Sequence, residues 1–285
     1  MSSLASHVPK VLGYRLGIGT FMNLKQLGQN WHEFGRRDPL WAILSLPGKE
    51  GRNWDLQEFF LTGQVEIEKA LEFVASQDLR INNGRALDFG CGAGRLTQAL
   101  AKHFDEAYGV DIAPSMIELA VTHNQYPNSC HYQLNTKPDL SQFVDCHFDF
   151  IYSCRVLQHM KPEYALQYIG EFIRLLKPGG AIVIQEPTEK LVLASPTVQP
   201  KPEPVGFKVL LKKLIPQPLL NWYYKIRLDY LLSKHEQLPK MEMYGVPVEQ
   251  MKAFVQDHGA VVRAVVPDYS CNDWASVCYC ITKDR

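Results

Sequence analysis

Leu87-Asp88-Phe89-Gly90-Cys91-Gly92-Ala93-Gly94-Arg95 is the stretch of sequence that decides the fold. It joins a short apolar strand to a predicted helix, and it places a glycine at every second position from 90 to 94. Glycine lets a backbone bend sharply and lets a ligand approach without meeting a Cβ atom. A dinucleotide-binding turn would show Gly-x-Gly-x-x-Gly facing a pyrophosphate, whereas here the third glycine comes one residue early. The stretch therefore predicts a ligand-binding turn, but not the usual one for a dinucleotide.

Two aspartates indicate what this turn holds. Asp88 stands two residues before the first glycine, and Asp111 closes the next predicted strand 23 positions later. A carboxylate repels a pyrophosphate but favours a cationic ligand, and one carboxylate can accept hydrogen bonds from both hydroxyls of a ribose. S-adenosylmethionine fits, since it carries a sulfonium, an ammonium and a ribose but no phosphate. Taken singly, the glycines and the aspartates also have a purely structural interpretation, as a chain turn and as helix caps.

Strands alternate with helices along most of the chain. The predicted strands are 85–89, 107–110, 130–134, 148–154, 181–185, 260–266 and 274–281. The predicted helices begin at a capping box from Asp55 to Glu58, at Leu96, at Pro114, at Pro162 and at Pro247. This alternation predicts an α/β fold with a mostly parallel, doubly wound sheet, and the last two strands are antiparallel because no helix fits between them. The ligand should lie beyond the carboxyl ends of the strands, at 88–95, 111–112, 134–136 and 153–159.

Successive motifs of the chain follow the order of a known enzyme family. They are the glycine turn, Asp111, Phe148-Asp149-Phe150-Ile151 and Leu175-Leu176-Lys177-Pro178-Gly179-Gly180. Together they resemble the motifs of class I S-adenosylmethionine-dependent methyltransferases, over roughly residues 60–187 and 247–283. The resemblance implies S-adenosylmethionine as cofactor and a Rossmann-like sheet of seven strands, the sixth and seventh being antiparallel.

The resemblance also implies roles for individual positions. The residues of the turn expected at the cofactor are Asp88, Gly90, Cys91, Gly92 and Gly94. Asp111 would bind the ribose, Ile112 would flank the adenine, and Asn135 would lie near the adenine amino group. The residues expected beside the amino acid end of the cofactor are Cys154, Arg155 and Val156.

Two polar residues after the fourth strand are candidates for further chemistry. His159 is a candidate general base, because an imidazole titrates near neutral pH, and the alternative is a histidine that holds a loop carbonyl. Arg155 follows a buried strand directly. It is expected either to bind a carboxylate of cofactor or substrate or to extend to solvent.

Two segments stand outside the core fold. Residues 1–54 form an N-terminal arm whose aromatic density, with Trp31 and Trp41 on either side of Asp38-Pro39, suggests a lid or a hydrophobic anchor. Residues 187–246 form an insertion after the fifth strand, between domain segments 55–186 and 247–285. Within it, 207–234 is amphipathic with a charge of +5, from six basic residues and one acidic. That pattern predicts a helical cap or dimer contact, with a membrane surface or a hydrophobic substrate as alternatives.

Composition narrows the choice of partners. Thirty basic and thirty acidic residues give no net charge, which disfavours nucleic acid as the substrate. The apolar fraction is 46%, without a run long enough for a transmembrane helix, and no histidine or cysteine spacing indicates a metal site. Seven cysteines without a Cys-x-x-Cys pair are expected to be free thiols, which favours the cytoplasm.

The sequence as a whole predicts a methyltransferase that acts on a small molecule, more readily at oxygen than at nitrogen or carbon. A lid-sized insertion suits one enclosed ligand better than a polymer. Two alternatives stay open: a nicotinamide-dependent oxidoreductase, and a non-catalytic module that binds a nucleoside.

Overall fold

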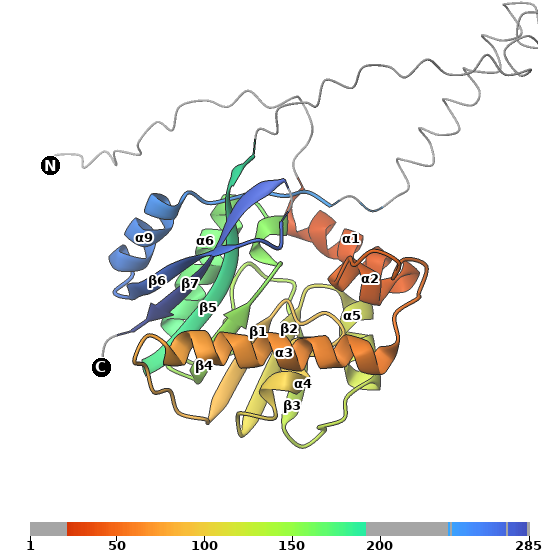
Figure 1. Ribbon diagram of the computed structural model, residues 1–285, viewed down its shortest axis with the longest axis horizontal. Helices are drawn as coiled ribbons and strands as arrows, with labels where there is room; N and C mark the ends of the chain where they lie inside the picture. The colour runs from red at the N-terminus through yellow and green to blue at the C-terminus, as the bar shows by residue number, and fades with distance from the viewer. Residues whose placement is uncertain (1–21, 192–238, 240, 272, 284–285) are drawn as a thin grey trace, which may run out of the picture.

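A seven-stranded sheet forms the centre of the molecule, with the strand order β3-β2-β1-β4-β5-β7-β6. The computed structural model describes residues 22–191, 239, 241–271 and 273–283 (Figure 1). The strands are β1 (Arg85–Phe89), β2 (Glu106–Asp111), β3 (Cys130–Leu134), β4 (Phe148–Ser153), β5 (Leu176–Lys190), β6 (Val261–Asp268) and β7 (Trp274–Thr282). The first five strands are parallel, and β7 runs antiparallel to both of its neighbours. The predicted α/β fold, with its antiparallel last strand, is therefore confirmed.

Helices cover both faces of this sheet. They are α1 (Leu24–Arg37), α2 (Pro39–Ile43), α3 (Leu56–Ala75), α4 (Arg95–Leu100), α5 (Pro114–Thr122), η1 (Leu157–His159, a 3₁₀ turn), α6 (Pro162–Leu175) and α9 (Val248–Asp257). Figure 1 shows α3 crossing one face while α6 lies behind the other.

Strand alternation explains the two layers. Successive side chains of a strand point to opposite faces. In β1, Leu87 and Phe89 pack in the same apolar cluster as α6, and the ring of Phe89 lies 4.5 Å from that of Tyr168. Ala86, the residue before Leu87, points to the opposite face and packs in the cluster that holds Ile67 of α3. Both faces are therefore apolar.

The N-terminal arm contains a helix that the sequence analysis did not predict. Helix α1 begins at a capping box, in which the side chains of Asn23 and Gln26 each accept a backbone N–H at 3.0 Å. It docks on α5, where the hydroxyl of Ser115 donates to the carbonyl of His32 at 2.8 Å. A Cβ at Gly35 would lie 2.3 Å from that hydroxyl oxygen, so glycine allows the close approach. The arm is thus anchored by packing.

Strand β5 differs from its prediction at both ends. The Lys177-Pro178-Gly179-Gly180 stretch, expected to separate helix from strand, belongs to the strand, and a register irregularity against β4 accommodates it. At the other end the strand continues to Lys190, which pairs with Trp274 of β7. The sheet therefore extends four residues into the segment expected to be an insertion.

The amphipathic segment predicted over 207–234 lies outside the described residues. Within the ranges that the structure describes, no helix has the length and apolar character to cross a bilayer. All seven cysteines fall within these ranges and are free thiols.

Candidate functional site

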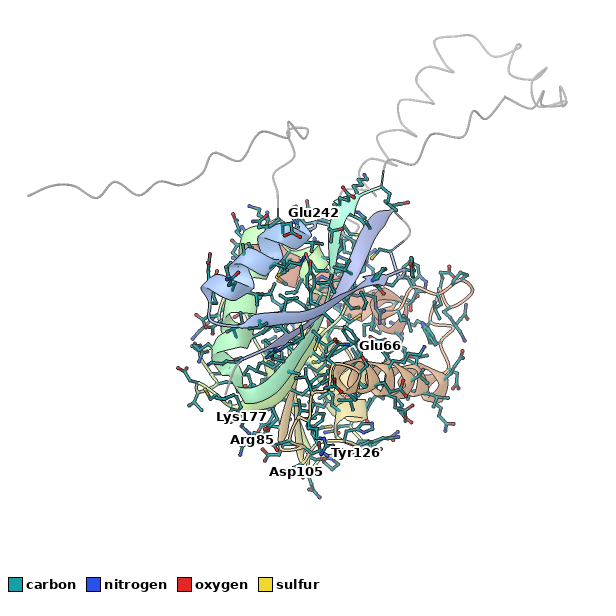
Figure 2. All side chains as sticks on the ribbon, turned by 60° about the vertical axis from the view of Figure 1, so that its left-hand side comes forward. Glu66, Arg85, Asp105, Tyr126, Lys177 and Glu242 are labelled. Carbon is teal, nitrogen blue, oxygen red and sulfur yellow. The ribbon has the colours of Figure 1, made fainter. Side chains whose placement is uncertain are left out.

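A cavity of about 620 Å³ opens at the carboxyl ends of the parallel strands. Its volume falls in the range of small-ligand sites, about 300–1,000 Å³. Figure 2 shows the orientation: Glu242, beside the cavity residue Met241, lies at one end of the molecule, while Arg85 and Lys177, near the amino ends of β1 and β5, lie at the other. The sheet therefore places the cavity where the sequence analysis expected a ligand.

Ten of the twelve predicted site residues line this cavity. They are Gly90, Cys91, Gly92, Asp111, Ile112, Asn135, Cys154, Arg155, Val156 and His159. The two that do not are Asp88 and Gly94.

Asp88 contacts helix α4, which follows the glycine turn, and does not line the cavity. Its carboxylate accepts a hydrogen bond from the hydroxyl of Thr97 on α4 at 2.6 Å, and its Oδ1 has no partner among the described residues. Burial raises the pKa of Asp88 to about 7, although the Thr97 hydroxyl opposes this shift. At neutral pH its carboxyl group is therefore only partly charged. Because Asp88 also does not line the cavity, it makes no contact there that would attract a cationic ligand.

Gly94 serves packing. It precedes α4 in the left-handed conformation, with φ of 82°, and a Cβ there would lie 2.4 Å from the hydroxyl of Tyr132.

The cavity side of the turn begins at Gly90. Its N–H donates to the carbonyl of Val110 at 2.7 Å, which ties the end of β1 to β2. Its φ is +79°, and a Cβ at this position would lie 2.3 Å from a methyl carbon of Val156. Glycine is thus required here for two reasons: the positive φ favours it, and Val156, which follows β4, leaves no room for a Cβ atom.

Asp111 presents a carboxylate to the cavity wall. Its two oxygens accept the N–H groups of Gly92 and Ala113 at 2.9 and 2.8 Å. Burial raises the pKa of this carboxyl group, and the two N–H groups oppose the shift. Each carboxylate oxygen has a second lone pair, so the group can still accept from a ligand hydroxyl.

Asn135 uses most of its amide within its own loop. Its Nδ2 donates to the carbonyls of Lys137 and Asp139 at 3.2 and 2.9 Å, and its Oδ1 accepts the N–H of Lys137 at 3.2 Å. It shapes the cavity beside Asp111, with one lone pair of Oδ1 left for a ligand.

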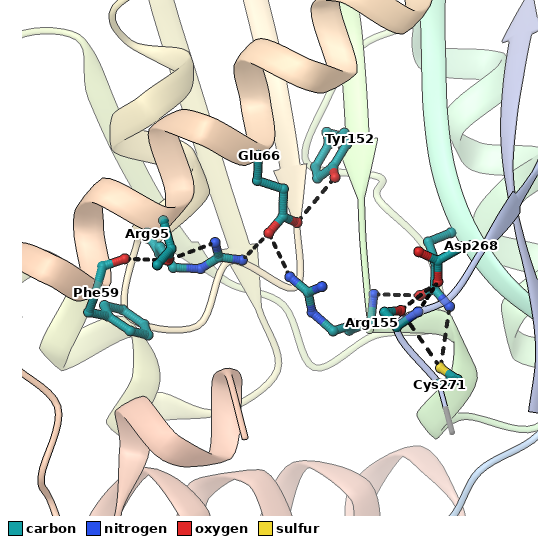
Figure 3. A network of polar contacts seen from close by, with 10 residues as sticks. Phe59, Glu66, Arg95, Tyr152, Arg155, Asp268 and Cys271 are labelled. Carbon is teal, nitrogen blue, oxygen red and sulfur yellow. Dashed lines mark hydrogen bonds and ion pairs between the residues drawn. The ribbon is translucent and has the colours of Figure 1, made fainter. Parts of the chain in front are cut away.

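Two arginines of the cavity wall share one carboxylate (Figure 3). Glu66 of α3 accepts from Arg95 at 2.8 Å and from Arg155 at 2.7 Å. Burial alone would raise the pKa of Glu66, but the two guanidinium charges outweigh it and lower the pKa to about 2. Neither expectation for Arg155, an external carboxylate or open solvent, describes this contact, because the chain supplies the carboxylate itself.

Arg155 also adopts an unusual backbone conformation. Its φ is +60°, in a region that residues other than glycine rarely occupy. Its backbone N–H donates to the side chain of Gln185 at 2.9 Å. This bend directs the chain from β4 into η1, where His159 lies.

His159 is buried in the far wall. Its Nδ1 lies 3.0 Å from the carbonyl of Glu242, and its Nε2 lies 3.1 Å from the amide nitrogen of Gln158. The ring of Trp31 meets it edge-on at 5.3 Å. Burial lowers the pKa of His159, partly offset by the Glu242 carbonyl. The neutral form of the ring is therefore favoured, and the Nε2 lone pair lies against the Gln158 amide nitrogen.

Several cavity residues were not named as site residues by sequence reasoning. From α1 to the residues after α2 they are Leu24, Leu27, Trp31, Ile43, Leu44 and Leu46, and from the carboxyl-terminal part they are Met241, Met243, Cys271 and Trp274. The aromatic density of the arm was the only signal for this group. Trp31 lines the cavity, whereas Trp41 packs in a separate cluster with Trp54 and Phe59.

Known proteins share this domain. Residues 87–184 match the family model described as a methyltransferase domain. The ubiquinone biosynthesis O-methyltransferase of Xanthomonas campestris pv. campestris is 29% identical over 115 residues, which are 40% of this chain and 47% of that protein. Its counterpart from Xylella fastidiosa is 30% identical over 110 residues, 38% of this chain and 44% of that one. The chain thus matches about half the length of these curated relatives.

Solved structures share the fold over a longer range. Magnesium protoporphyrin IX methyltransferase from Synechocystis, crystallised with S-adenosylhomocysteine, gives a TM-score of 0.56 at 16% identity and covers 92% of this chain and 100% of that one. An S-adenosylmethionine-dependent methyltransferase from Leishmania major gives 0.56 at 15% identity, covering 90% and 83%. At these identities the likeness concerns the fold.

The strand order and the cavity at the carboxyl ends define a Rossmann-like methyltransferase fold. Residues 87–184, which hold the glycine turn, Asp111 and His159, belong to the class I S-adenosylmethionine-dependent methyltransferases.

Proposed function

We propose that this protein is an enzyme that transfers a methyl group from S-adenosylmethionine to an oxygen of a small molecule. One observation carries the proposal: the glycine turn and the Asp111 carboxylate share a cavity with a neutral, buried histidine. A cofactor-binding edge and a proton acceptor therefore face the same enclosed space.

The cavity wall suits the cofactor chemically. Gly90 and Gly92 bring bare backbone to the wall, and Asp111 offers free lone pairs to ribose hydroxyls. The two arginines that would otherwise suit a diphosphate already share Glu66. This donor set favours a nucleoside without phosphate over a nicotinamide dinucleotide.

When bound, the cofactor supplies a methyl group on a sulfonium, a leaving group that needs no further activation. The protein's task is then to align the acceptor, exclude water and remove a proton. In this reaction Nε2 of His159 would take the proton of the acceptor hydroxyl, once that hydroxyl replaces the Gln158 N–H as its partner. The Nδ1–H of the ring stays on the Glu242 carbonyl and stabilises the imidazolium that results.

Apolar side chains surround the remaining space. Trp31, Met160, Met241, Met243 and Trp274 line it together with leucines of α1 and of the segment after α2. Such a wall favours a hydrophobic acceptor with few polar groups. The relatives named for ubiquinone biosynthesis are O-methyltransferases, which supports oxygen as the atom methylated.

Calorimetric titration of the full chain tests the cofactor. We expect saturable binding of S-adenosylhomocysteine and none of NADH; the reverse result would establish the oxidoreductase alternative. Transfer of a radiolabelled methyl group to a panel of phenols, carboxylic acids and amines then tests the reaction. Binding of S-adenosylhomocysteine without transfer to any of them would favour the non-catalytic alternative.

A further inference from the structure

A buried glutamine connects His159 to the turn between β6 and β7. The amide nitrogen of Gln158 lies 3.1 Å from Nε2 of His159, and its amide oxygen lies 3.6 Å from the sulfur of Cys271. Both Gln158 and His159 are 6% exposed. The glutamine therefore contacts the ring nitrogen that the Glu242 carbonyl does not.

The direction of each hydrogen bond follows from chemistry. The Glu242 carbonyl can only accept, so Nδ1 of His159 carries the ring proton and Nε2 carries the lone pair. Nε2 then accepts from the amide nitrogen of Gln158. This leaves the amide oxygen of Gln158 to accept from the thiol of Cys271. The contacts with the Glu242 carbonyl and the Cys271 thiol are thus consistent with one orientation of the Gln158 amide and one tautomer of the imidazole.

Cys271 is in turn positioned by a residue of the sheet. The side chain of Gln185, 2% exposed, donates to its sulfur at 3.8 Å and also donates to the hydroxyl of Ser276 on β7. The side chain of Gln185 also accepts a hydrogen bond, at 2.9 Å, from the backbone N–H of Arg155, the residue with the positive φ. Figure 3 follows this network from Glu66 through Arg155 to Cys271.

The other neighbours of the ring do not compete for Nε2. Trp31 of α1 meets the ring by its edge. The Glu242 carboxylate is turned away, since it accepts from the Tyr244 hydroxyl and from the N–H of Met22. The Gln158 amide is thus the contact that sets the state of Nε2.

We propose that Gln158 is a positioning residue for His159: anchored by Cys271, its amide N–H holds the Nε2 lone pair and so fixes the tautomer and orientation of the imidazole. The functional meaning rests on the proposed role of His159 as base. An acceptor hydroxyl that reaches Nε2 takes the place that the Gln158 N–H occupies.

Nuclear magnetic resonance of the full chain, labelled with ¹⁵N-histidine, tests this without cofactor or acceptor. The signals of His159 are those missing in the His159→Asn variant. In the wild-type protein we expect the proton on Nδ1, and a proton on Nε2 would overturn the proposal. A failure of cofactor binding would leave this result intact, so the two proposals fail separately.

Substitution supplies the decisive comparison. Gln158→Glu places a carboxylate at Nε2, and we expect the proton affinity of His159 to rise at least roughly tenfold. The matched control is Gln98→Glu, in another buried glutamine, whose amide contacts the His123 carbonyl and the Gln125 N–H. It should leave His159 within about twofold of wild type. The other eight histidines report whether each variant is folded.

A neutral variant covers the case in which Gln158→Glu does not fold. Gln158→Met keeps the length of the side chain but removes the donor, so the ¹⁵Nε2 resonance should move to that of a lone pair without a hydrogen bond. A folded variant whose Nε2 resonance stays at the wild-type position would overturn the proposal, as would an unchanged titration midpoint in folded Gln158→Glu.

Discussion

The carboxylate of Glu66 and the guanidinium of Arg155 lie 2.7 Å apart, although 89 residues separate them in the chain. Glu66 belongs to the helix that covers one face of the sheet, and Arg155 forms the strained bend at the end of β4. A strained backbone persists only where its surroundings hold it. The ion pair therefore helps to fix the path of the chain from the sheet to His159.

Removal of this carboxylate should destabilise the fold in a pH-dependent way. The pKa of Glu66 falls from 4.5 to about 2 on folding, so at pH 7 the charged form contributes about 3 kcal/mol. This contribution is complete above the unfolded pKa and is lost as pH falls through about 2. In urea unfolding, Glu66→Gln should thus lose about 3 kcal/mol at pH 7, and the difference from wild type should narrow below about pH 4.5.

The exposed Glu68, on the same helix, supplies the control for this experiment. Glu68→Gln should remain within about 0.5 kcal/mol of wild type. A Glu66→Gln variant that matches Glu68→Gln at pH 7 would rule out the stabilising role.

The ribose assignment predicts a loss of cofactor affinity in Asp111→Asn. We expect binding of S-adenosylhomocysteine to weaken by about 1–3 kcal/mol, since a charged acceptor is replaced by a neutral one. Calorimetry measures the change, and Asp105→Asn, at the opposite end of the molecule (Figure 2), is the control. Equal affinities in the two variants would contradict the assignment.

The role of His159 as base predicts a change in rate rather than in cofactor binding. His159→Gln should lower turnover roughly 100-fold or more and leave the affinity for S-adenosylhomocysteine within about twofold. Steady-state kinetics and calorimetry together separate the two effects. A variant with full activity would leave His159 a structural role only.

The pH profile offers an independent check on this base. Burial lowers the pKa of His159 below the ordinary value of a histidine, about 6.5, so the ring should stay competent to accept a proton at lower pH than a free imidazole. We expect the midpoint of the decline in rate to lie below that ordinary value, where the ring becomes protonated. A decline centred at or above 6.5 would indicate another group as the base.

The close approach at the glycine turn predicts a large cost for one added methyl group. Gly90→Ala would combine a positive φ with a carbon 2.3 Å from Val156, and should lose about 3 kcal/mol in unfolding experiments. Gly48→Ala shares a φ of +81° but meets no atom within 4 Å, so it should lose about 1 kcal/mol. Equal losses would mean that contact with Val156 does not matter.

Sequence patterns predicted the strands well where glycine, proline and apolar runs mark their limits. β1 and β3 have their predicted bounds because both are short segments with clear ends. β5 runs longer at both ends because its pairing with β4 and β7 outweighs the local turn residues. Helix α1 escaped prediction because its docking depends on contacts with distant residues, such as the hydrogen bond from Ser115 of α5 to His32.

The residues of the site also differ in how well the sequence predicted them. Gly90 and Asp111 were predictable because their roles follow from positions next to strand ends. Asp88 was misleading, since strand alternation points it toward Thr97 and away from the cavity. Glu66 and Cys271 were not predictable, because each reaches the site only through long-range packing.

Strand β7 follows β6 in the chain but lies between β5 and β6 in the sheet. On the ribosome, β6 therefore emerges before the strand that attaches it, so the pair must dock onto β5 as a late unit. That unit brings Cys271 and Trp274 with it. The wall of the cavity is therefore complete only once β7 has paired with β5.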